Sequence, residues 1–94
     1  MTDDGANRYF PERHPHVLAT LIRESRFRPV RFVTGYDMRE VDDLLDRLVD
    51  ALSAGRPVRP LVASATFATT RLREGYSQVD VDTLLAEVAR RAEA

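Results

Sequence analysis

The chain has 94 residues, of which 44% are hydrophobic and 31% charged, and its formal net charge is −1. This balance excludes a disordered tail and a global basic field for nucleic acid, and the absence of Cys and Lys excludes disulfides, thiolate metal sites and lysine-based catalysis. No apolar run approaches the ~18 residues that a membrane-spanning helix requires, and the acidic, polar first residues predict no secretory signal peptide.

The chain begins with a polar stretch, residues 1–14, that we predict to be a flexible lead. After it, HVLATLIRES behind Pro15 indicates a short helix, since proline is tolerated in a first turn. His14 and His16 flank this proline, and we interpret them as solvent-exposed residues at a helix start without a metal. The next segment, RFRPVRFVTG, is predicted to be a loop because Pro29 and the β-branched valines disfavour helix.

A long helix is predicted to start near Met38, after the signal GYD. Asp37 is a favourable N-cap residue, and Glu40 three positions later has the spacing of a capping box. Gly35 can adopt a positive φ where the chain turns into the helix. The apolar residues recur in steps of three and four and form one stripe, which contains Val41, Leu44, Leu45, Leu48, Val49 and Leu52. A helix of ~16 residues is marginal alone, so this stripe must be buried against a partner.

The second part of the chain repeats the first at an offset of 40 positions without a gap, and nine of the 28 pairs between 27–54 and 67–94 are identical. It therefore predicts a second short helix after Pro60, a loop led by Phe67, and a second long helix. The apolar stripe of that helix contains Val81, Leu84, Leu85, Val88, Ala89 and Ala92. The signals at the two long-helix starts are Gly35, Tyr36, Asp37, Gly75, Tyr76 and Ser77. We divide the chain into the lead 1–14, repeat 1 at 15–56 and repeat 2 at 57–94, the two repeats forming one compact domain.

The predicted fold class is all-α, with two repeats of short helix, loop and long helix. The two long helices are predicted to pair as a short parallel coiled coil through Val41, Leu44, Leu45, Leu48, Leu52, Val81, Leu84, Leu85 and Val88. Two arrangements satisfy this pairing: the stripes meet within one chain, or each meets its copy in a homodimer. We expect Phe27 and Phe67 to be buried between short and long helices.

The order of a short helix, a Phe-led loop, GY[D/S] and a helix beginning xxVDxLL resembles the N-terminal domain of the DivIVA family of bacterial polar and septal scaffold proteins. The resemblance covers roughly Leu21 to Leu52 and again Leu61 to Ala92. It implies a dimeric, non-enzymatic domain whose crossing loops touch the membrane through an apolar side chain beside a basic one. For this chain it implies a contact surface of Arg31, Phe32, Val33, Leu72 and Arg73, to which we add the neighbouring Arg28 and Arg71. It also implies that the side chain of Phe32 is exposed.

The residues and the resemblance together predict a non-enzymatic adaptor or scaffold at the cytoplasmic face of the membrane, in bacterial cell division or polar growth. The alternative is a soluble protein-interaction module that uses the same fold without binding lipid. The expected partners are another protein or a second copy of the chain, with an anionic membrane surface in the first alternative. We expect no cofactor, metal or nucleic acid, since the sequence holds no nucleophile–base arrangement, Gly-rich phosphate loop or metal motif.

Overall fold

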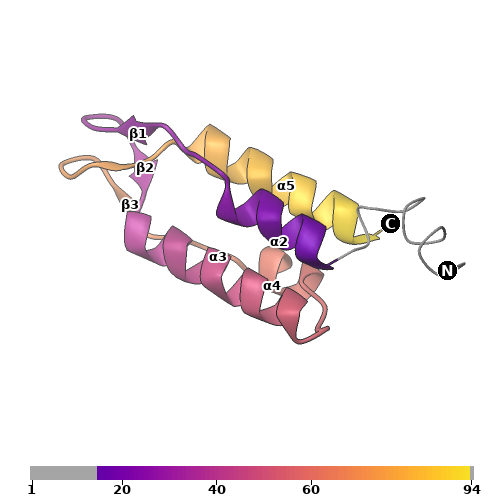
Figure 1. Cartoon of the computed structure of the whole chain (residues 1–94). Coiled ribbons are helices and arrows are strands. Elements are labelled where there is room, and N and C mark those ends of the chain that lie inside the picture. The colour runs from indigo at the N-terminus through magenta and orange to yellow at the C-terminus, as the bar shows by residue number, and fades with distance from the viewer. Residues whose placement is uncertain (1–14, 94) are drawn as a thin grey trace, which may run out of the picture.

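The computed structural model of the chain describes residues 15–93, and the predicted lead 1–14 lies outside them. The described residues form two halves with the same order of elements (Figure 1). The first half contains α2 (Pro15–Arg23), β1 (Pro29–Val30), β2 (Gly35–Tyr36) and α3 (Met38–Ser53). The second half contains α4 (Arg59–Ala63), β3 (Thr69–Thr70), β4 (Gly75–Tyr76) and α5 (Gln78–Glu93). The repeat in the sequence is therefore also a repeat in the structure, element for element.

The four short strands form one antiparallel sheet in which the two halves alternate. Its strand order is β1-β4-β2-β3. β1 pairs with β4, β3 pairs with β2, and the two central strands meet where Tyr36 lies opposite Tyr76. Every strand pair therefore joins one half of the chain to the other.

The prediction of an all-α fold is wrong, because segments predicted as loops pair as strands. Val30, Thr69 and Thr70 are β-branched, and the stiffness that disfavours helix at these residues favours extended backbone. Each finds its pairing partner in the other half of the chain. A strand of two residues shows no alternation of apolar and polar side chains, so the sequence pattern does not reveal it.

The parallel coiled coil predicted for the two long helices is also wrong. α3 and α5 both begin at the sheet and run away from it in the same direction, but α2 lies between them and contacts both (Figure 1). α2 packs most closely on α3, and α4 packs on α5. The short helices thus fill the space in which the apolar stripes of α3 and α5 would meet in a coiled coil.

One hydrophobic core lies among the helices. Its buried residues are Leu18, Ala19 and Ile22 of α2, Val41, Leu44, Leu48, Ala51 and Leu52 of α3, Val58 before α4, and Val81, Leu84, Leu85 and Val88 of α5. Of the nine stripe residues expected to pair the long helices, eight are buried and Leu45 is half-buried. Both stripes therefore enter the same core, with α2 as their shared neighbour.

Candidate functional site

The start of α3 binds the chain of the other half. Asp37 caps the helix, since its Oδ1 accepts a hydrogen bond from the backbone N–H of Glu40 at 3.0 Å. The Asp37 N–H, which a capping box would pair with Glu40, instead donates to the carbonyl of Ala68 at 2.8 Å. The Glu40 carboxylate accepts from the Ala68 N–H at 2.7 Å. The reciprocal bond expected within the helix is thus replaced by a clamp between the halves.

The start of α5 repeats this clamp around Arg28. Ser77 Oγ accepts from the N–H of Asp80 at 3.3 Å, and the Ser77 N–H donates to the Arg28 carbonyl at 2.8 Å. The Asp80 carboxylate accepts from the Arg28 N–H at 2.9 Å and from its guanidinium, with 3.0 Å between Nη2 and Oδ1. These hydrogen bonds lower the pKa of Asp80 and raise that of Arg28. Arg28, a predicted contact residue, is therefore bound by Asp80 at its backbone and its side chain.

The Arg28–Asp80 clamp predicts a loss of stability in acid. A carboxyl group whose pKa is lowered by folding stabilises the fold above its ordinary pKa and loses that contribution as the pH falls through the folded value. Glu87 on α5 makes stability depend on pH in the same direction, because hydrogen bonds from Arg90 and Arg91 lower its pKa from 4.5 to about 2. We expect the melting temperature to fall between pH 4.5 and pH 2, and to fall less in Asp80→Asn and Glu87→Gln. Circular dichroism melts measure this, and equal pH slopes in wild type and variants would contradict it.

Two aromatic pairs join the halves beside the sheet. Their ring centroids lie 5.0 Å apart in each case, and the pairs are Phe27 with Tyr76 and Tyr36 with Phe67. The Tyr36 hydroxyl donates to Asp82 at 2.8 Å, and the Tyr76 hydroxyl donates to Asp42 at 2.9 Å. The hydrogen bond to Asp82 raises the pKa of Tyr36, whereas burial is the main cause that raises the pKa of Tyr76. The two phenylalanines, predicted to be buried, are half-buried against the core.

Gly35 and Gly75 allow the central strands to approach each other closely. Gly35 does not adopt the positive φ predicted for it, so that prediction is wrong. A Cβ atom on Gly35 would lie 3.0 Å from the carbonyl oxygen of Tyr76, and one on Gly75 would lie 2.7 Å from that of Tyr36. Both positions therefore require glycine, because a Cβ atom at either would collide with the backbone of the other central strand.

The connections β1–β2 and β3–β4, residues 31–34 and 71–74, project from the same end of the molecule, and together we call them the tip (Figure 1). The tip carries exposed apolar side chains: Phe32 is 71% exposed, Val33 55% and Leu72 84%. The prediction that Phe32 is exposed is confirmed. Exposed apolar side chains gathered at one end of a molecule are typical of an interaction surface.

The backbone of Phe32 lies in the left-handed region, with φ of 68°. Among residues 15–93, it is the one non-glycine residue with a positive φ. This conformation costs a bulky residue ~1–3 kcal/mol, which glycine would avoid. The Phe32 N–H donates to the Arg71 carbonyl at 2.9 Å, so the opposite loop helps to hold it. An exposed aromatic residue at a position that favours glycine indicates a role for the side chain itself.

Three arginines of the tip surround these apolar side chains. Arg73 is partly engaged, since its Nη2 lies 3.5 Å from Asp37 Oδ2. Within residues 15–93, no ion pair engages the side chains of Arg31 and Arg71, which are exposed. The tip thus offers two unpaired guanidinium groups next to apolar groups, a combination suited to a surface that is anionic outside and apolar beneath.

Comparisons with protein-family models, with curated proteins and with solved structures found no match. Among residues 15–93, no group of three or more His, Cys, Asp or Glu side chains is arranged to hold a metal ion. The same residues include no helix with the length and apolar character needed to cross a membrane. What the chain does must therefore be inferred from its own geometry.

Proposed function

We propose that the chain is a non-enzymatic, DivIVA-like adaptor whose tip docks on the cytoplasmic face of an anionic membrane. The observation that carries this proposal is the exposure of Phe32, Val33 and Leu72 together at one end of the molecule. Apolar side chains gain free energy when they leave water for the boundary between headgroups and acyl chains. Each basic residue held near an anionic surface adds ~1 kcal/mol, and Arg31 and Arg71 stand beside the apolar groups.

The sheet behind the tip supports this function because it fixes both loops in one frame. The two strands that flank each loop belong to one half of the chain and pair with strands of the other half. The hydrogen bond from Phe32 to Arg71 joins the loops directly. Two apolar contacts held in this way engage one surface together, so the second contact adds to binding without a further loss of translational freedom. The resemblance to DivIVA domains is our reason for proposing cell division or polar growth as the setting.

Replacing Phe32 with glutamate is expected to abolish membrane binding. The change removes the gain from inserting an aromatic ring, ~1.5–3 kcal/mol, and adds a charge that anionic lipid repels. Co-sedimentation with vesicles of anionic phospholipid measures the effect, and we expect bound protein to fall by more than about tenfold. Zwitterionic vesicles should retain much less wild-type protein, because the arginine contribution is absent there.

Two further variants separate the role of the side chain from stability. Val79 on α5 is 68% exposed but outside the tip, so Val79→Glu should leave sedimentation unchanged. Phe32→Gly relieves the positive φ and should raise the free energy of unfolding by ~1 kcal/mol while still losing vesicle binding. If wild type fails to sediment, or Phe32→Glu sediments equally well, membrane docking is refuted. The first of these results favours the soluble protein-interaction module.

A further inference from the structure

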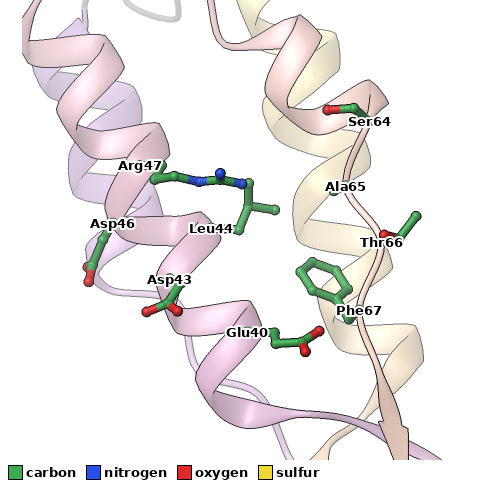
Figure 2. A pocket seen from close by; sticks show the side chains of 9 residues that line it. All are labelled: Glu40, Asp43, Leu44, Asp46, Arg47, Ser64, Ala65, Thr66 and Phe67. Atoms are coloured by element: carbon green, nitrogen blue, oxygen red, sulfur yellow. The ribbon is translucent and has the colours of Figure 1, made fainter.

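A groove of about 590 Å³ lies between α3 and the segment 64–67, which leads into β3 (Figure 2). Leu44 and Phe67 supply its apolar lining. Glu40, Asp43 and Asp46 line it from α3 and outnumber the single basic residue, Arg47. The groove therefore combines an aromatic wall with a negative side, and it is open to solvent.

Comparison of the two halves shows that the fold does not require this negative charge. The offset of 40 positions pairs Asp43 with Thr83 and Asp46 with Ala86, and all four residues are exposed on their helices. α5 forms the same helix, at the same place in its half, without either carboxylate. Asp43 and Asp46 thus serve neither helix formation nor packing.

We infer that this groove is a docking site for the tip of a second copy of the chain. The tip presents Phe32 and Leu72 among three arginines and one glutamate. The groove presents the half-buried ring of Phe67, with the buried Leu44 at its floor, among three acids and one arginine, and one of these acids, Glu40, also accepts from the Ala68 N–H. The two surfaces are thus apolar at their centres and opposite in charge, the arrangement that steers and orients protein partners. This inference goes beyond membrane docking, because it assigns a role to the groove and a second ligand to the tip.

The contact would be weak and would propagate. Two short loops bury far less than the ~800 Å² per partner of a standard interface, which predicts a dissociation constant of about 0.1–1 mM. Tip and groove are different surfaces, so one contact leaves a free tip at one end and a free groove at the other. Such a head-to-side contact adds further copies. A tip seated in a groove is not free to enter a membrane, so only the tip at the end of such an assembly remains available to lipid.

Sedimentation equilibrium of the full chain tests this inference without lipid. We expect concentration-dependent association that weakens as salt screens the charges. The double variant Asp43→Thr/Asp46→Ala, which installs the residues of the second half, should associate at least about tenfold more weakly. Asp50→Ala is the matched control, because Asp50 is an exposed acid of α3 outside the groove. A monomeric wild type, or a double variant that associates like wild type, would overturn the inference.

Mixing two defective variants gives a sharper result. Phe32→Glu keeps its groove but loses its tip, and Asp43→Thr/Asp46→Ala keeps its tip but loses its groove. Each alone should be monomeric, whereas the mixture should form 1:1 pairs and nothing larger, since only defective surfaces remain free. A mixture that stays monomeric would overturn the head-to-side contact. The groove variant should still sediment with anionic vesicles, so a failure of docking between copies is distinguished from a failure of membrane docking.

Discussion

Gly75→Ala is expected to lower the free energy of unfolding by about 2–3 kcal/mol, and to be more damaging than Gly35→Ala. A Cβ atom at position 75 would lie 2.7 Å from the carbonyl oxygen of Tyr36, a backbone atom that moves only if the central strand pair moves. At position 35 the nearest atom is Cγ2 of Val30, at 2.6 Å, which is the end of a side chain that can rotate. Both glycines face equivalent neighbours, the Cγ2 of a β-branched residue and the carbonyl oxygen of a tyrosine, but the order of the distances differs. The carbonyl is the closer atom at position 75 and lies 3.0 Å away at position 35.

Urea unfolding of both variants measures this difference. Gly55 provides a reference, since it has φ of 73° and its Cβ would meet no heavy atom within 4 Å. Gly55→Ala should therefore lower the free energy of unfolding only by the strain of a left-handed backbone, ~1–2 kcal/mol. If Gly75→Ala proved no more damaging than Gly35→Ala, the closer approach of position 75 to the Tyr36 carbonyl would be in error.

Leu48→Ala is expected to lower the free energy of unfolding by about 3 kcal/mol. Leu48 is fully buried in the core that both halves share, at 0% exposure, and its removal leaves a cavity that surrounding helices fill only in part. A chain of this length has ~5–14 kcal/mol of total stability, so the loss is a large fraction of it.

Leu45 is the matched control for this change. It belongs to the same sequence stripe and has the same side chain, but it is only half-buried at the edge of the core. Leu45→Ala should therefore cost about 1 kcal/mol. Equal losses from the two substitutions, measured by chemical denaturation, would show that the long helix is turned differently toward its neighbours.

The sequence predicts the helices and the repeat well because these features are periodic and long. The stripe from Val41 to Leu52 spans several turns, so the structure has α3 where the pattern indicates it, from Met38 to Ser53. The sequence holds no comparable signal for the element that packs on this stripe. α2 places Leu18 and Ile22 in the core between the long helices, and its apolar face suits several arrangements equally well.

The candidate site was partly predictable for a similar reason. The exposure of Phe32 was expected from the resemblance to DivIVA domains, which places it in the contact loop, whereas its positive φ has no counterpart in the sequence. Glu40 and Asp80 carry a recognisable signal, an acid three positions after the N-cap. That signal predicts a bond within the helix, and the carboxylates instead reach Ala68 and Arg28 of the other half. A local pattern does not record contacts between segments that are distant along the chain.

The fold and the tip both depend on the intertwining of the two halves, in which Phe27 packs on Tyr76 and Tyr36 packs on Phe67 within one chain. Isotope-filtered nuclear Overhauser spectra of a dilute mixture of labelled and unlabelled protein test it directly. We expect both ring contacts in the labelled chain and neither of them between chains. Contacts between Phe27 and Tyr36 of the same half, or ring contacts seen only between chains, would contradict it.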